Sequence, residues 1–340
     1  MAQKGKLFKT LTICCAALSV AAITASAVLL PGLFDKMTGT ADTPTGRQLS
    51  REATINGYAD VTRFGAVPDD GKDDTKAFKK AQETGISLYV PAGKYEINDT
   101  IALDNQGIKG DGTGLSFITG SSAKSLISVT GRAAILDLCL GYDEKALTKS
   151  EKQGEAAALV LDGLKSSSIV YNLSISGAGT GIYSPADGKG IDCAAFESIT
   201  INNCTYKSVD IAKTTGLVLR TAEIKNDKYT IDIPVSISGI FTIEQLRFSD
   251  VKCEFPLEFN NADSAVVKSL IFENVTANGK SFIKSISSGI SIQAISATGS
   301  PADFAVSCAD EENRPTGGVI KSLYSDSAQA VTFEKDDKIN

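Results

Sequence analysis

Four acidic residues of this sequence each stand between two apolar residues, in short segments that follow one another along the chain. The segments are Ile191-Asp192-Cys193, Val209-Asp210-Ile211, Ile231-Asp232-Ile233 and Leu257-Glu258-Phe259, at steps of 18, 22 and 26 residues. Alternation of this kind is typical of a β-strand, which turns the apolar pair to one face and the acid to the other. If these strands are stacked, the four carboxylates form a row at a spacing of about 4.8 Å. Like charges this close need a cation, shifted pKa values or ample water.

Such a row suggests two kinds of chemistry. Carboxylate oxygens are the ligands that Ca²⁺ prefers, so the candidate calcium ligands are Asp192, Asp210, Asp232 and Glu258. The candidate catalytic residues are Asp192, Asp210 and Asp232, with Asp187, Arg220 and Lys225 nearby in the sequence. The sequence contains no His, which excludes a Ser-His-Asp or Cys-His arrangement and any His-ligated metal.

Two acid–base reactions fit these residues. Two carboxyl groups can hydrolyse a glycosidic bond, with retention at about 5 Å separation and inversion at about 6.5–9.5 Å. β-Elimination on a uronate instead needs a cation to neutralise the substrate carboxylate and a base, such as Lys or Arg, to remove a proton. A non-catalytic role is the alternative, in which the acids are solvated polar positions on the outside of a binding or structural module.

A repeat of apolar residues predicts the elements that would hold these acids. The central positions of the repeat are Ile175, Ile201, Ile224, Phe248, Phe272 and Ala297, separated by 26, 23, 24, 24 and 25 residues. A period in this range, built from β-branched and aromatic residues, indicates a solenoid in which each coil is buried against its neighbours. Because the local pattern is alternation, the coils are made of strands. The sequence therefore predicts an all-β fold, a parallel β-helix.

The segment before the first coils predicts a terminal cap. Ala77, Phe78 and Ala81 lie on one face of a short helix that begins after Asp73 or Asp74. A solenoid needs an element that covers the open end of its core, and an amphipathic helix over the first coil does so. The acids of 69–74 are interpreted as turn and helix-cap residues, with a calcium loop as the alternative.

This region resembles the opening of the pectate-lyase-like superfamily. The matching segments are Phe64-Gly65-Ala66, Asp70-Gly71, Asp73-Asp74-Thr75, Pro91-Ala92-Gly93-Lys94-Tyr95 and Gly110-Asp111-Gly112. The resemblance covers residues 56–120, and it implies a right-handed parallel β-helix of a group that mostly acts on polysaccharides. It implies little about chemistry, because these segments are structural in that group.

A second segment is similar to the coil that carries an active-site Asp in polygalacturonases. It runs from Asp187-Gly188 through Gly190-Ile191-Asp192-Cys193 to Ile199-Thr200-Ile201-Asn202-Asn203-Cys204, and Asp187 matches the active-site Asp. Two residues are inserted after Asp187-Gly188, the paired Asp of that family would fall near 206–208, and its Gly-His-Gly is absent. Arg220 and Lys225 are the nearest bases to its missing Arg-Ile-Lys.

The N-terminus predicts the compartment. Lys4, Lys6 and Lys9 precede an uncharged run from Thr10 to Phe34. This arrangement is typical of a cleaved signal peptide, with Ala25-Ser26-Ala27 as a cleavage site, or of an uncleaved membrane anchor. In both cases the body is outside, secreted or tethered to the surface. An export signal disfavours a phage receptor-binding spike.

We therefore expect a signal or anchor at 1–34, a linker at 35–56, a β-helix domain at 57–332 and a charged tail at 333–340. The net charge of −6 argues against a nucleic-acid partner. Of the seven Cys, two lie in the N-terminal apolar segment, and the other five, which have no close-pair spacing, indicate mainly buried apolar residues, with one disulfide as an option. The expected partner is a polysaccharide, with Ca²⁺ as the candidate cofactor and membrane contact only through the N-terminal segment.

Overall fold

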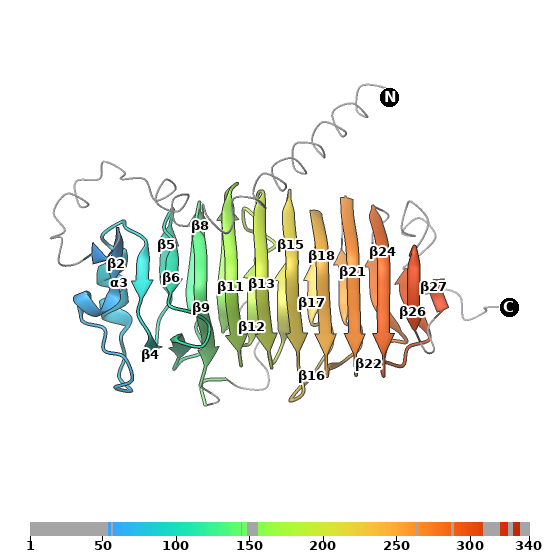
Figure 1. Ribbon diagram of the computed structural model, residues 1–340, viewed down its shortest axis with the longest axis horizontal. Helices are drawn as coiled ribbons and strands as arrows, with labels where there is room; N and C mark the ends of the chain where they lie inside the picture. Colours follow the sequence, from blue (N-terminus) through green and yellow to red (C-terminus); the bar gives the residue numbers. More distant parts are fainter. Residues whose placement is uncertain are drawn as a thin grey trace, which may run out of the picture.

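The chain winds into an elongated parallel β-helix in the computed structural model (Figure 1). The structure describes residues 54–55, 57–143, 145–147, 156–260, 262, 264–286, 289–308, 320–325 and 329–333. Within these residues the strands form a 14-stranded, a ten-stranded and a three-stranded sheet. Each coil contributes to the sheets in turn, and every pairing except that of β1 with β2 is parallel. The predicted fold class is confirmed.

The 14-stranded sheet forms one side of the β-helix. Its strands are β1 (Thr54–Ile55), β2 (Tyr58–Asp60), β3 (Leu88–Val90), β4 (Gly93–Ile97), β6 (Ile108–Gly110), β7 (Ser116–Gly120), β9 (Ala134–Tyr142), β11 (Ser168–Ser176), β13 (Ala194–Asn202), β15 (Leu217–Lys225), β18 (Ile240–Ser249), β21 (Ser264–Glu273), β24 (Ile290–Thr298) and β26 (Ser322–Ser325).

The ten-stranded sheet forms a second side. Its strands are β5 (Ile101–Asp104), β8 (Ile127–Gly131), β10 (Ala157–Leu164), β12 (Thr180–Ser184), β14 (Lys207–Ile211), β17 (Val235–Ile237), β20 (Leu257–Asn260), β23 (Ser281–Ile286), β25 (Phe304–Cys308) and β27 (Gln329–Phe333). The three-stranded sheet consists of β16 (Thr230–Ile231), β19 (Lys252–Cys253) and β22 (Thr276–Ala277).

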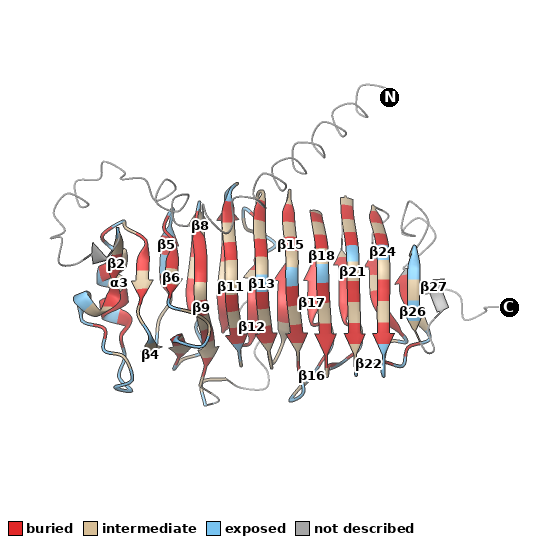
Figure 2. Ribbon diagram, viewed as in Figure 1, coloured by how far each residue is buried: buried red, intermediate tan, exposed pale blue. Residues whose placement is uncertain are grey.

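The central residues of the sequence repeat are stacked on one another in the 14-stranded sheet. Ile175 pairs with Ile201, and the register then continues through the other central residues to Ala297. All of them are buried, because the inward positions of each strand can only be shielded from water by the coils above and below. Figure 2 shows the result as buried and half-buried bands that cross this sheet at the same height in successive strands.

A short helix covers the N-terminal end of the core, as predicted. It is α3 (Thr75–Gln82), and it buries Ala77, Phe78 and Ala81 beside the 3-10 helix η1 (Val61–Phe64). The ring of Phe78 packs edge-on against Tyr95 at 5.8 Å between centroids. Figure 1 shows α3 at the end of the stack, where the first coil would otherwise expose its interior to water.

The acids that precede α3 are turn and cap residues. Asp69 and Asp73 accept hydrogen bonds from the backbone N–H groups of Lys94 and Thr75, each at 3.0 Å. The N-cap residue is Asp74, yet its carboxylate accepts from the N–H of Val67 at 2.9 Å and caps the loop before the helix. Asp73 therefore supplies the side-chain cap, and the interpretation of these acids as turn and cap residues is confirmed.

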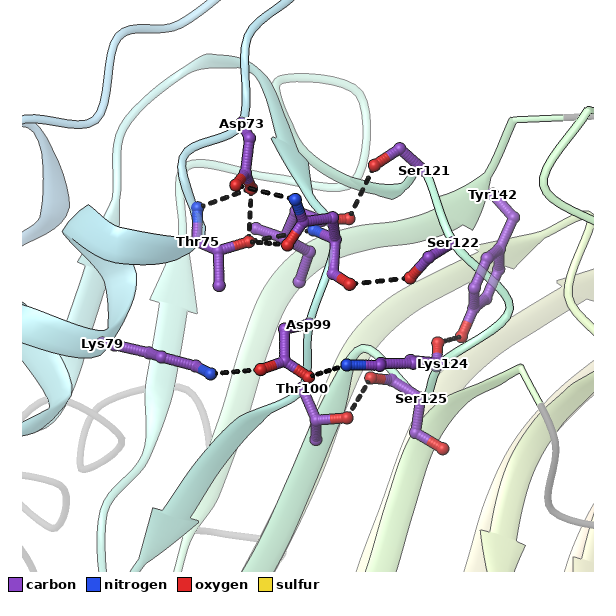
Figure 3. Close-up of polar contacts among 12 residues, drawn as sticks. Asp73, Thr75, Lys79, Asp99, Thr100, Ser121, Ser122, Lys124, Ser125 and Tyr142 are labelled. Atoms are coloured by element: carbon purple, nitrogen blue, oxygen red, sulfur yellow. Dashed lines mark hydrogen bonds and ion pairs between the residues drawn. The ribbon is translucent and has the colours of Figure 1, made fainter.

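A polar network ties α3 to the next two coils (Figure 3). The carboxylate of Asp99 forms ion pairs with Lys79 of α3 and with Lys124, the latter at 2.8 Å. Hydrogen bonds from Lys124 and Lys79 lower the pKa of Asp99 well below its usual range. The charged form of Asp99 is therefore favoured in the folded state.

We expect Asp99 to make the cap sensitive to acid. Because the pKa of Asp99 is lower in the folded than in the unfolded chain, its contribution is fully present above the unfolded pKa of about 4 and is lost as the pH falls toward the folded value. The stability difference between wild type and Asp99→Asn should thus be constant above about pH 5 and should shrink below about pH 4. Denaturation midpoints from pH 2 to 8 measure this. Lys124→Met should reduce the same pH dependence, and an unchanged profile in both variants would contradict the assignment.

Four cysteines of the described coils form no disulfide. Cys204 and Cys253 are buried, and burial raises the pKa of each to about 12. Cys139 and Cys193 are half-buried. These four therefore behave as small apolar residues, and the optional disulfide does not occur among them.

Several predicted segments lie outside the described residues. They are the signal or anchor at 1–34, the linker at 35–56 except for β1, and the charged tail at 333–340 except for the end of β27. Within the described ranges, no helix is both long enough and apolar enough to cross a bilayer.

Candidate functional site

A row of polar side chains crosses the outer face of the ten-stranded sheet. The register pairs Tyr183 with Asp210, Asp210 with Ser236, Ser236 with Glu258 and Glu258 with Lys284, on β12, β14, β17, β20 and β23. We call these five residues the polar row.

The polar row faces away from the core. On β14 the neighbours of Asp210 are Val209 and Ile211, which belong to the hydrophobic core, and on β20 Glu258 stands between two core residues in the same way. Since successive side chains of a strand alternate between its faces, the two acids point outward. Both are nevertheless shielded, with 4% of Asp210 and 9% of Glu258 exposed.

Neighbouring polar groups hold the two acids in place. Lys207 Nζ lies 3.2 Å from Asp210 Oδ1, and Ser236 Oγ donates a hydrogen bond of 3.1 Å to Glu258 Oε2. Asp210 and Glu258 are two strand steps apart, so their Cα atoms are separated by about 9.6 Å. Acids on alternate coils are thus spaced nearer to what inversion uses, about 6.5–9.5 Å between carboxyl groups, than to the about 5 Å of retention.

Aromatic rings lie on either side of these acids. Lys207 Nζ is 5.9 Å from the centroid of the Tyr206 ring, and Lys284 Nζ is 5.5 Å from that of Phe255. Burial raises the pKa of Tyr183, and the negative charges of Asp210 and Asp187 raise it further. The Tyr183 hydroxyl therefore stays protonated and can donate a hydrogen bond to a ligand.

Asp192 does not belong to the polar row, which corrects the predicted ladder of acids. It lies at the corner between β12 and β13, where Ile191 forms isolated bridges to Leu164 and Thr214. Its carboxylate accepts hydrogen bonds from Ser166 Oγ at 2.7 Å and Thr215 Oγ1 at 3.0 Å. The Ser166 hydrogen bond lowers the pKa of Asp192. These bonds join three coils, so the carboxylate has a structural role at this corner.

Asp232 is likewise outside the row, because its strand has a different register from the one predicted. It follows β16, and its backbone carbonyl accepts hydrogen bonds from the N–H groups of Glu254 and Phe255. The outward position on this coil is taken instead by Ser236, between Val235 and Ile237. The residues around Asp232 thus form a turn, and the strand begins only after Pro234.

The other three candidates are also dispersed. Asp187 lies in an exposed turn after β12, close enough to influence Tyr183. Arg220 and Lys225 are on β15 of the 14-stranded sheet, in ion pairs with Glu197 at 2.6 Å and Asp250 at 3.3 Å. Both bases therefore belong to a different sheet from the polar row.

The predicted calcium site and the polygalacturonase-like coil do not fit this geometry. In the part of the chain that the structure describes, no group of three or more His, Cys, Asp or Glu residues could hold a metal ion. The four predicted ligands therefore do not form one cation site. In the polygalacturonase-like segment, Ile191 forms isolated β-bridges, and Asp192 and Cys193 lie outside the strands, between β12 and β13.

Sequence reasoning identified Asp210 and Glu258, but it missed Tyr183 and Ser236 as members of the row. Their segments, Ile182-Tyr183-Ser184 and Val235-Ser236-Ile237, have a single outward residue between two inward ones, as the acidic segments do. A search for any polar residue in that position, and not only for acids, would have found Ser236.

Comparison with known proteins gives one family model. The rhamnogalacturonase A/epimerase, pectate lyase-like model matches residues 58–137, which include α3 and the first coils. No curated protein matches the chain.

Several solved structures are similar to this chain. A tailspike of Acinetobacter phage vb_AbaP_AS12 is 9% identical, with a TM-score of 0.52, over 83% of this chain and 64% of the tailspike. The Agl-KA catalytic domain is 15% identical, with a TM-score of 0.48, over 83% of this chain and 66% of the domain. The A-module of Azotobacter vinelandii mannuronan C-5 epimerase AlgE4 is 11% identical, with a TM-score of 0.41, over 81% of this chain and 96% of the module. The chain thus spans slightly less than two thirds of the first two.

Proposed function

We propose that this parallel β-helix, whose residues 58–137 match the rhamnogalacturonase A/epimerase, pectate lyase-like model, acts on extracellular polysaccharide along the polar row. The observation that carries the proposal is the alignment of Tyr183, Asp210, Ser236, Glu258 and Lys284 on one outer face. Hydroxyl, carboxylate and ammonium groups can all hydrogen-bond the hydroxyls of a sugar chain, and successive coils repeat them along a line.

Hydrolysis with inversion is the reaction that this geometry favours. We assign Asp210, which pairs with Lys207 at 3.2 Å, the role of the general base that activates water. Glu258 is then the general acid that protonates the leaving oxygen, and inversion requires about 6.5–9.5 Å between the two carboxyl groups. A calcium-assisted elimination is less well supported, because the predicted ligands lie apart.

A non-catalytic binding module is the second candidate, and the shielding of the two acids favours it. With 4% and 9% of their surface exposed, Asp210 and Glu258 are held by Lys207 and Ser236 as structural groups would be. In this case the polar row binds a glycan without cleaving it.

For the compartment, we propose secretion or surface tethering through the N-terminal segment. The basic residues and the uncharged run at the start of the sequence support this. Fractionation of the native host with an antibody against the β-helix tests it, and a protein found only in the cytosol would refute it.

Two substitutions in the polar row should abolish the function. We expect Asp210→Asn and Glu258→Gln each to lower the rate of polysaccharide cleavage about 100-fold or more, because each removes a proton-transfer group. The assay incubates the protein with a polysaccharide panel and measures both reducing ends and ultraviolet-absorbing unsaturated products. Asp232→Asn is the matched control, since it removes an acid of the same coils that lies outside the row.

The outcomes separate the candidates. New reducing ends without ultraviolet absorbance indicate hydrolysis, and unsaturated products indicate elimination. Glycan binding without any product, weakened in Asp210→Asn but not in Asp232→Asn, indicates the binding module. Neither binding nor cleavage across the panel would reject the polar row as the functional site.

A further inference from the structure

The outer face of the 14-stranded sheet carries a continuous line of mostly apolar residues. We call it the outer apolar row, and its members are Ala134, Ile169, Ala195, Val218, Thr242 and Val266. They alternate with core residues along each strand, so they point away from the interior. A sheet face turned to water is expected to be polar, and this row is not.

The chain already covers one end of this row. Ala134 and Leu136 are buried in a small cluster of their own, packed under Tyr58, Ile169 and Tyr171. From Ala195 to Val266 the row is only half-buried. The full row spans five strand steps, or about 24 Å.

A line of alternating charges runs beside the apolar row, two residues further along each strand. This outer charged row consists of Glu197, Arg220, Glu244 and Lys268 on β13, β15, β18 and β21. Arg220 pairs with Glu197 at 2.6 Å and Lys268 with Glu244 at 2.8 Å. The order of the charges along the stack is negative, positive, negative, positive.

A second copy of the chain that is turned end to end presents the same four charges in the opposite order. A two-fold axis parallel to the strands, between β15 and β18, brings the outer faces of the two copies together and reverses the order of the coils in the second copy. Glu197 then lies opposite Lys268 of the partner subunit, and Arg220, whose side chain is 11% exposed, lies opposite Glu244 of the partner subunit, so each charged position meets one of opposite sign. The same axis lays the outer apolar row on that of the partner, with Ala195 facing Val266 of the partner subunit.

We propose that the outer apolar row and the outer charged row form a self-association surface, on which a second copy of this chain packs in the antiparallel orientation. Contact between the two apolar rows supplies the attraction. The charges favour the arrangement in which the coils of the two copies run in opposite order, because coils in the same order would place like charges opposite one another. The strands that this axis pairs, β13 to β21, span three strand steps, or about 14 Å, which is small for a permanent dimer, so the association is weak and concentration-dependent. The polar row lies on another sheet and stays open in both copies.

Sedimentation velocity of the full chain over a range of concentrations, in one mild-detergent buffer, tests the apolar contact. We expect a monomer–dimer equilibrium that Val218→Asp weakens at least tenfold without changing the thermal midpoint. Thr298→Asp is the control, an exposed position at the far end of β24. A wild type that stays monomeric throughout, or a Val218→Asp variant that dimerises equally well, would overturn the proposal.

Charge exchange tests the orientation independently. Arg220→Glu and Glu244→Arg should each lose the dimer, because each places like charges opposite one another across the two-fold axis. An equimolar mixture of these two variants should form a heterodimer, since every facing pair is then opposite in sign. Failure of the mixture to associate, with both variants folded by circular dichroism, would rule out the antiparallel packing.

Discussion

Replacing Phe272 with Ala is expected to cost about 3–5 kcal/mol of folding free energy, the range measured for large aromatic residues in packed cores. Phe272 is fully buried at the centre of a stack of rings, 5.2 Å from Phe248 and 4.5 Å from Phe282 between centroids. Phe248 lies on the preceding coil, and Phe282 extends from the ten-stranded sheet. The substitution therefore leaves a cavity between two coils and between two sheets.

Urea denaturation followed by circular dichroism measures this loss. Because each coil of a solenoid is stabilised by its neighbours, the C-terminal coils should lose amide hydrogen-exchange protection first. Ile271→Ala is the matched control, since Ile271 is next in the strand but points outward and is half-buried. It should cost about 1 kcal/mol or less. Equal losses for the two variants would contradict the inward register of β21.

The second large effect is expected at the turn between β17 and β18, where Gly239→Ala should destabilise the chain by about 2–5 kcal/mol. Gly239 has a φ of 98°, a conformation that side chains rarely adopt. A Cβ atom there would lie 2.1 Å from the carbonyl oxygen of Thr214. That oxygen accepts a hydrogen bond from the N–H of Ile240 at 2.8 Å, so neither backbone can move away without breaking a contact between coils.

Two other glycines separate the causes. Gly65 also has a positive φ, 107°, but a Cβ atom there meets nothing within 4 Å, so Gly65→Ala measures the cost of the dihedral alone. Gly114 has neither a positive φ nor an atom within 4 Å of an added Cβ, so Gly114→Ala should leave the stability almost unchanged. We expect thermal midpoints to fall in the order Gly114→Ala, Gly65→Ala, Gly239→Ala. A Gly239→Ala variant no less stable than Gly65→Ala would mean that the turn does not approach Thr214 so closely.

Most of the fold could be predicted from the sequence, because the features that specify it are local or periodic. The apolar residues at steps of 23 to 26 positions pair in register from Ile175 to Ala297, as expected. The cap helix was also predictable, since Ala77, Phe78 and Ala81 have helical spacing and follow acids that can cap a helix.

The candidate site was only partly predictable. Asp210 and Glu258 do lie on one outward row, but Ser236 stands between them where Asp232 was expected. A shift of one residue in a strand exchanges its two faces, so an apolar-acid-apolar segment cannot by itself establish which way its acid points. Pairings such as that of Arg220 with Glu197 were also hidden, because the two residues are 23 positions apart.

The sequence by itself determined that this chain coils, roughly how long each coil is, which residues fill the core and how one end is closed. These properties follow from burial, which must be satisfied at every coil and therefore recurs at nearly equal intervals. Only the tertiary structure decided which polar residues stand next to one another on the outside. That depends on the length and shape of each turn, and turns differ from coil to coil because water, unlike the core, does not require a fixed spacing.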